Sequence, residues 1–234
     1  MIESPMEILN QVHQNANQAL KIAKHPEDHQ RLLSKLYAYH DKIRAESMVA
    51  ASVTVACKAG CNLCCYMKVD AQAHEIIFLY NYLIEHSSCA EIETIKERCN
   101  TYYHDVRHLS LEEHLGCSIL CPLNVNSKCF AYSARPYYCR NFHAQNYGTC
   151  QYSFDNPDDM GSPESLHVFV KAIGSASLLG CSLAYTDAGY DQRAYDLCSG
   201  LCHIFQDPRA VQRWRSKKSA FPKDCISKQQ QMES

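Results

Sequence analysis

The sequence lacks a long hydrophobic run and an excess of charge of either sign. Its densest apolar stretch runs from Ile76 to Ile84 and is interrupted by Asn81. A membrane-spanning helix needs roughly 18 consecutive apolar residues, about twice that length. The 23 basic and 25 acidic side chains give a formal net charge of −2. This balance argues against the basic surfaces that bind nucleic acid or anionic membranes, so we expect neither partner.

The first residues carry no basic segment followed by an apolar run, which is the pattern of a secretory signal. On this ground we expect a cytoplasmic protein, or one delivered by a route that leaves no N-terminal signature. The sequence also lacks a glycine-rich phosphate loop, a His-Glu-x2-His motif, a nucleophile elbow and a clear carboxylate pair. If the protein is an enzyme, a metal centre or the cysteines must carry its chemistry.

Cysteine, in contrast, is abundant, with 15 among 234 residues. Disulfide frameworks belong to small secreted chains, whereas this chain has the length of an ordinary domain and an odd number of cysteines. In a reducing compartment, clustered thiols more often bind metal or carry out chemistry. We therefore favour metal binding over disulfides and over incidental cysteines.

Apolar periodicity predicts a mainly α-helical single domain with two irregular cysteine-rich loops joined at a metal site. Helices are expected over 5–47 as an antiparallel hairpin, and over 71–86, 90–108, a short turn from 111, 163–184, 190–206 and 208–214. The helix over 71–86 is apolar nearly all round and should lie at the centre. The chain then divides into an N-terminal helical hairpin (1–50), a cysteine-cluster metal-binding core (51–160), C-terminal helices packed on that core (161–220) and a flexible tail (221–234).

Two helix-poor segments, 48–69 and 117–161, contain nine of the fifteen cysteines. Loops with so few apolar residues need another source of stability, and a metal ion supplies one because its binding energy becomes folding energy. In the first segment, Cys61 and Cys64 form a Cys-x2-Cys pair, the recurrent half of structural zinc and iron–sulfur sites. Gly60 beside them suits a turn that needs a positive φ.

Cys64 and Cys65 are adjacent, and neighbouring side chains in an extended segment point to opposite sides. This favours two ions or a polynuclear cluster over one four-thiolate zinc finger. The second segment adds four sulfurs at spacings that are individually weak signals. Eight sulfurs are enough for two tetrahedral sites or for one cluster with spare ligands. The expected ligands are Cys57, Cys61, Cys64, Cys65, Cys121, Cys129, Cys139 and Cys150.

The two segments together resemble the CxxCxxCC zinc- or iron-chelating domain family, the YkgJ-like proteins. That family has a run ending in Cys-x2-Cys-Cys, here Cys61 to Cys65, followed by Cys-Pro and an apolar residue, here 121–123. It continues with Cys-x2-Tyr-x2-Arg-Pro-x2-Cys-Arg, here Cys129 to Arg140. The resemblance covers about residues 55–150, and three residues separate Cys57 from Cys61 where the family name has two.

The resemblance implies zinc or iron as the bound metal, including iron in an iron–sulfur cluster. A flagellin lysine methylase with a similar cysteine motif is thought to use such a cluster. An enzymatic role therefore stays open, but only by analogy, because a shared scaffold does not fix function.

Several residues near these motifs are further candidates. Arg135 and Arg140 are expected to contact the cofactor by hydrogen bonds to sulfur, or else to brace the loop through backbone carbonyls or a carboxylate. Additional ligands would come from Cys117, His143, or the pair Cys198 and Cys202, which share one helix face. For that pair we favour a role as small buried core residues.

Three classes of function remain. The favoured one is a metal-binding cysteine-cluster protein that holds or handles zinc or iron. The second is an iron–sulfur-dependent enzyme of the protein-modifying or group-transfer type, and the third is a zinc-stapled protein-interaction module. A metal ion is the one partner that the sequence indicates, and it does not identify a protein partner.

Overall fold

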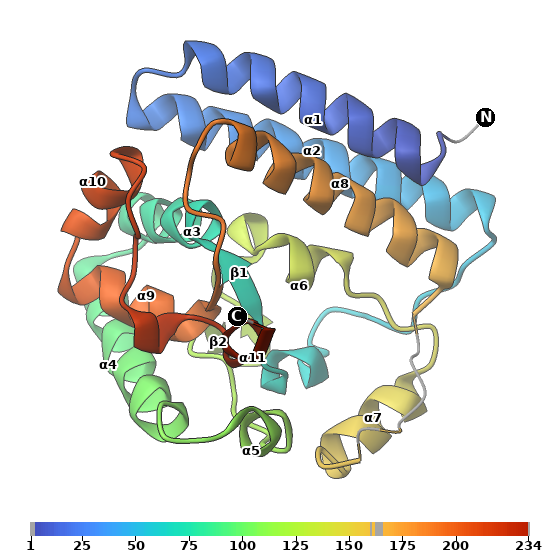
Figure 1. The fold of residues 1–234 in the computed structure, drawn as a ribbon. Helices are drawn as coiled ribbons and strands as arrows, with labels where there is room; N and C mark the ends of the chain where they lie inside the picture. The colour runs from blue at the N-terminus through green and yellow to red at the C-terminus, as the bar shows by residue number, and fades with distance from the viewer. Residues whose placement is uncertain (1–2, 160, 162–165, 234) are drawn as a thin grey trace.

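Three long helices form a layer on one side of the molecule: α1 (Pro5–Ile22), α2 (Pro26–Ala50) and α8 (Val168–Asp187) (Figure 1). The structure is a computed structural model that describes residues 3–159, 161 and 166–233. Helix α1 begins with a capping box in which Ser4 and Glu7 satisfy each other's backbone N–H groups, as the sequence predicts. Its buried residues recur every four positions and form one stripe: Ile8, Val12, Ala16 and Leu20.

The expected hairpin of α1 and α2 is completed by α8, which comes from far along the chain and makes the most extensive contact with α1. Gly180 permits this close approach, since a Cβ at this position would lie 2.6 Å from the carbonyl oxygen of Leu9. The expected start of this helix at 163 lies outside the described residues. Helix α8 is long and apolar enough to span a membrane, but half of that window is buried in the fold, as in the core helix of a globular protein.

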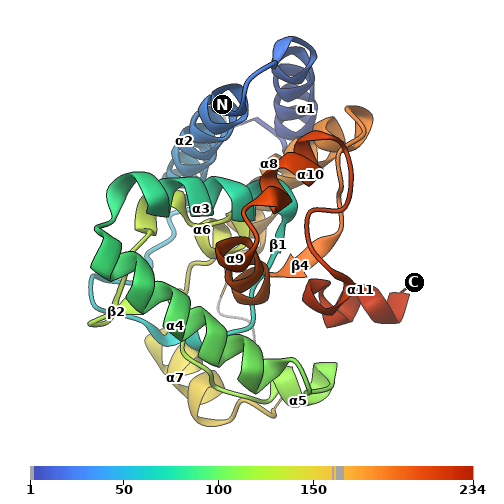
Figure 2. The same ribbon diagram turned by 90° about the vertical axis from the view of Figure 1, so that its left-hand side faces the viewer.

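Helix α3 (Ala73–His86) lies below this layer and forms the centre of the core, as predicted (Figure 2). It packs against α2 and against α9 (Leu197–Gln206), while α4 (Cys89–Val106) packs on α9. Short helices α5 (Leu111–Leu115) and α10 (Arg209–Arg215) follow α4 and α9. A capping box of Ser110 and Glu113 begins α5, again as predicted.

Two small strands replace helix at positions where the sequence predicts helix. β1 (Asp70–Gln72) pairs antiparallel with β4 (Ala194–Asp196), with Ala71 opposite Tyr195. The expected helices from 71 and 190 therefore begin only at 73 and 197. Ala71 and Tyr195 are both buried, so the extended pair places them in the core and joins two segments distant in sequence.

The C-terminal segment differs from the flexible tail that we expected. After the short 3₁₀ helix η3 (Lys223–Cys225), Ser227 donates a hydrogen bond to Asp70 Oδ2 (2.5 Å), and both Cys225 and Ser227 are buried. Lys228 Nζ donates to the carbonyl oxygen of Val106 (2.6 Å) at the beginning of α11 (Lys228–Glu233). Residues 221–228 thus pack on the core, because these polar anchors add to the burial of Phe221 and Cys225.

Candidate metal centre

The first cysteine loop is wound into consecutive tight turns. The backbone N–H of Cys61 donates to the carbonyl of Lys58 (3.0 Å), and that of Cys65 donates to the carbonyl of Asn62 (2.8 Å). Gly60 has φ of +88°, which confirms the expected need for glycine in this turn. The 3₁₀ helix η1 (Leu63–Tyr66) follows, and none of its four residues is buried.

The second cysteine segment has more regular structure than the irregular loop we expected. A two-residue turn with positive φ at Asn126 and Ser127 joins β2 (Asn124–Val125) to β3 (Lys128–Cys129). The 3₁₀ helix η2 (Tyr132–Ala134) and α6 (Tyr137–Asn141) follow, and α6 carries Cys139. Helix α7 (Tyr147–Asp155) carries Cys150. These elements were missed because none is long enough to show a period in the sequence.

The two loops fold against each other. The backbone N–H of Cys121 donates to the carbonyl of Cys65 (2.7 Å), and that of Ala56 donates to the carbonyl of Ala144 (2.7 Å). The rings of Tyr66 and Phe154 pack edge to face at 4.7 Å, which ties α7 to η1. The joining of two cysteine-rich loops, expected from the sequence, is thus present in the fold.

This arrangement brings seven of the eight predicted ligands into two neighbouring groups: Cys57, Cys61 and Cys150 in one, and Cys65, Cys121, Cys129 and Cys139 in the other. Burial raises the pKa of Cys150, and the thiols of its own group raise it further. Burial also raises the pKa of Cys129 to about 11 and that of Cys139 well above the usual value, again with contributions from the neighbouring thiols. Like charges act in this way only at short range.

Cys64 belongs to both groups, because Cys65, Cys139 and Cys57 all raise its pKa. The largest contribution is a hydrogen bond between the Cys64 and Cys65 thiols, which raises the pKa of Cys64 and lowers that of Cys65. The expectation that these neighbours point to opposite sides is therefore wrong. They lie in a 3₁₀ helix, where successive side chains are about 120° apart rather than alternating as in a strand.

The thiols lie near one another, but they do not converge on a single metal position. Within residues 3–159, 161 and 166–233, no three His, Cys, Asp or Glu side chains are arranged as a group that could hold a metal ion. None of the cysteines is in a disulfide. The backbone N–H of Ala144 donates to Cys57 Sγ (3.3 Å), a contact of the kind that orients sulfur ligands in metal sites.

The two arginines named from the sequence have different roles. Arg140 is buried and donates to the carbonyls of Ser133 and Arg135 and to Asp41 Oδ2 (2.6 Å). Its donors hold the loop, so it matches the bracing role rather than the contact with sulfur. The Arg135 guanidinium lies 3.6 Å from the centroid of the Tyr132 ring. Its positive charge contributes to the lowered pKa of Cys65 and opposes the rise in the pKa of Cys129 and Cys139.

Arg44 on α2 is a neighbour of this site that the sequence did not indicate. Burial lowers its pKa, and the adjacent positive charge of Arg135 lowers it further, while Cys57 opposes this effect. Two guanidinium groups thus lie beside the thiols. Nothing in the local sequence around Arg44 links it to residues 57 or 135, because only the packing of α2 brings them together.

The additional candidate ligands are mostly engaged elsewhere. His143 accepts from the backbone N–H of His167 (3.1 Å) and contacts the carbonyl of Asn141 through Nδ1 (2.9 Å), so neither nitrogen is available to a metal. Cys202 is buried and accepts from Gln206 (3.4 Å), as a core residue would. Cys198 is also buried, but its thiol hydrogen-bonds with that of Cys121 and so lies at the edge of the cluster. Cys117 is partly exposed.

Comparison with known proteins identifies no relative of this chain. No protein-family model, no curated protein and no solved structure matches this chain. The resemblance to the CxxCxxCC family therefore rests on the motif residues alone.

Proposed function

We propose that the protein binds zinc or iron through the eight clustered cysteines. The observation that carries this proposal is that each of these thiols, which come from separate stretches of the chain, lies within electrostatic range of at least one other. They are Cys57, Cys61, Cys64, Cys65, Cys121, Cys129, Cys139 and Cys150. Placing partly buried thiols side by side is unfavourable for their thiolate forms unless a cation is added. A metal ion supplies that positive charge and links the two loops.

The donor set fits this class of metal. Thiolates are the ligands that zinc and iron–sulfur centres prefer, and carboxylates are absent from the predicted set. Arg135 would offset the negative charge of bound thiolates, and the Ala144 N–H would orient Cys57. When bound, zinc would supply a structural crosslink, and an iron–sulfur cluster would add electron transfer.

An iron–sulfur centre, and with it an enzyme, is the second candidate. The position of Cys64 between the two thiol groups and its contact with Cys65 favour it. Adjacent thiols that approach each other suit a cluster with several metal atoms better than two separate tetrahedral ions.

The test is anaerobic purification followed by metal analysis, an acid-labile sulfide assay and a visible spectrum of the same sample. Iron with equimolar sulfide and a broad band near ~400 nm would identify an iron–sulfur centre. Zinc at about one or two ions per chain without sulfide would identify a structural site, and the helical surfaces would then be examined for a protein partner. A folded protein that retains neither metal, even after anaerobic reconstitution, would refute the proposal.

A further inference from the structure

Thiol–thiol hydrogen bonds at the cysteine loops join Cys64 to Cys65 and Cys121 to Cys198. Thiols in contact can be oxidised to a disulfide if the backbone allows its usual geometry. Adjacent Cα atoms lie about 3.8 Å apart across a trans peptide, whereas a disulfide usually joins Cα atoms about 4.4–6.8 Å apart. A disulfide between Cys64 and Cys65 would therefore be strained, and the pair of Cys121 and Cys198 does not have this restriction.

Backbone hydrogen bonds hold Cys121 and Cys198 beside the same short stretch of the chain. The N–H of Cys121 donates to the carbonyl of Cys65 (2.7 Å). The N–H of Leu197, which precedes Cys198 at the start of α9, donates to the carbonyl of Val69 (2.9 Å). Because the two acceptors lie within one short segment, the end of the first cysteine loop positions both cysteines.

Helix packing holds the two segments together from a second direction. Arg98 on α4 donates to the carbonyls of Pro122 (3.1 Å) and Asn124 (2.8 Å), directly after Cys121. Helix α4 packs on α9, and the side chain of Asp196 caps the first turn of α9. The segment after Cys121 and helix α9 are thus both held against α4. Since the thiols are already in contact, a bond between them needs movement of side chains rather than of helices.

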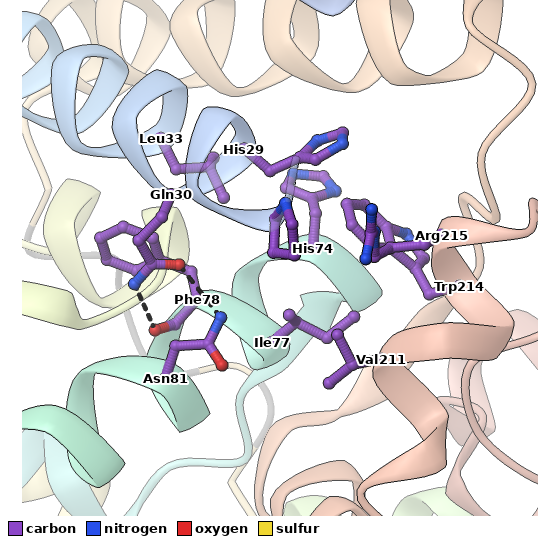
Figure 3. Close-up of a pocket in the computed structure, with 11 residues that line it drawn as sticks. His29, Gln30, Leu33, His74, Ile77, Phe78, Asn81, Val211, Trp214 and Arg215 are labelled. Carbon is purple, nitrogen blue, oxygen red and sulfur yellow. Dashed lines mark hydrogen bonds between the residues drawn. The ribbon is translucent and has the colours of Figure 1, made fainter. Parts of the chain in front are cut away.

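The two sulfurs differ in their access to solvent. Cys121 is partly exposed, whereas Cys198 is only 6% exposed. The small cavity between α2, α3 and α10 (Figure 3) gives no path to Cys198, because no cysteine lines it and its volume of about 10 Å³ holds one water-sized particle. A small oxidant therefore reaches Cys121 first, and Cys198 is the protected partner that reacts with the product.

We propose that Cys121 and Cys198 are a redox-active thiol pair, which hydrogen peroxide converts to a disulfide. The Cys121 sulfur attacks one peroxide oxygen, the O–O bond breaks, and the products are a sulfenic acid and one water molecule. The Cys198 sulfur then attacks the Cys121 sulfur and forms the S–S bond. Hydroxide leaves Cys121 and takes the Cys198 proton, which gives a second water molecule. Two thiols are oxidised and one peroxide is reduced.

The pair has a consequence for the proposed metal centre. Cys121 is one of the eight proposed ligands, and Cys198 is not. A disulfide would remove Cys121 from its thiol group, so peroxide should release the metal that this group holds. This consequence rests on the proposed function, whereas the disulfide itself does not.

The test is peptide mapping of the full-length protein, purified anaerobically and treated with equimolar hydrogen peroxide. Free thiols are alkylated in denaturant before digestion with trypsin, which places Cys121 in peptide 108–128 and Cys198 in peptide 194–209. We expect mass spectrometry to find these two peptides linked, with the link lost on reduction. Each peptide contains a second cysteine, so fragmentation spectra assign the bonded pair.

Two serine variants give the matched comparison. Cys198→Ser should abolish the link and leave Cys121 to be oxidised further to sulfinic acid. Cys202→Ser removes another buried thiol from the same helix and should retain the link. If Cys198→Ser does not fold, the maps of the unmodified protein and of Cys202→Ser decide alone. A Cys198 that remains a free thiol after peroxide treatment would overturn the proposal.

Metal content, measured before and after peroxide, keeps this proposal distinct from the proposed function. A protein that binds no metal would count against the metal centre and leave the peptide map fully interpretable. A map without the link between Cys121 and Cys198 would overturn the thiol pair and leave the metal centre untouched.

Discussion

Mild acid should destabilise this protein through three histidines that are buried and uncharged in the fold. They are His40, His74 and His114, none more than 3% exposed. Burial lowers the pKa of His40 and His74 to about 3 and that of His114 to about 4. Their ordinary value is about 6.5. Below that pH the unfolded chain binds protons that the folded chain does not, so the stability present above pH 6.5 is lost as the pH falls towards 4.

The expected size of this effect follows from the number of protons. Each histidine lowers the free energy of unfolding by about 1.4 kcal/mol per pH unit between its two pKa values. Three together give about 4 kcal/mol per unit, or on the order of 6 kcal/mol between pH 6.5 and 5.0. A domain is typically stable by about 5–15 kcal/mol, so much of its stability would be lost. Urea unfolding followed by circular dichroism at half-unit steps of pH measures this slope.

His40→Phe isolates one of the three contributions. Neither ring nitrogen of His40 has a hydrogen-bond partner in the described chain, and its ring packs edge to face on Tyr137 at 5.0 Å. Phenylalanine keeps that packing and cannot bind a proton. The slope should fall by about 1.4 kcal/mol per pH unit, with equal or higher stability at pH 7.

His108→Gln is the matched control, because His108 is exposed, and it should leave the slope unchanged. Comparing slopes at equal metal content cancels any loss of metal in acid. A His40→Phe slope equal to that of the unmodified protein would refute the reasoning.

Three further predictions concern the metal centre and the packing. Cys139→Ser should lower both the bound metal measured by mass spectrometry and the melting temperature. Cys181→Ser is the control and should leave the metal content unchanged. Equal metal content in the two variants would contradict the ligand set. Gly180→Ala should cost about 1–3 kcal/mol in urea unfolding, because its Cβ would meet the Leu9 carbonyl oxygen at 2.6 Å. Arg140→Gln should cost about 2 kcal/mol by the same assay, since two carbonyl contacts of a buried guanidinium and its ion pair with the partly exposed Asp41 are lost. An unchanged midpoint would show that the loop is held by other contacts.

Much of the helical structure could be predicted because its signals are local. Capping boxes at Ser4 and Ser110 and apolar stripes lie within a few residues of the helices they define. The pairing of β1 with β4 could not be predicted, because three-residue strands show no period and their partner is distant in sequence. The packing of α8 on α1 could not be predicted either, because it depends on Gly180 lying where α8 passes close to the backbone of α1.

The candidate site, too, was only partly predictable from the sequence. Sequence motifs named the eight cysteines, and Gly60 was expected to have the positive φ it shows. Arg44 and the contact of Cys198 with Cys121 were not found, since each depends on a helix that packs against the loops from elsewhere in the chain. The roles of Arg140 and His143 were open in the sequence because residue type does not show which acceptor a side chain will find.

The two cysteine loops differ in how much they depend on metal. The second is anchored to the core without it, since buried Glu75 accepts from the backbone N–H of Tyr137 (2.8 Å) and Arg140 holds the preceding carbonyls. The first has no buried residue in η1 and relies on a few backbone bonds. Chelation should therefore speed amide hydrogen exchange at Cys65 by at least about tenfold while the Tyr137 amide stays protected. Equal loss of protection in both loops would show that they unfold as one unit, and no change in either would mean that metal does not stabilise them.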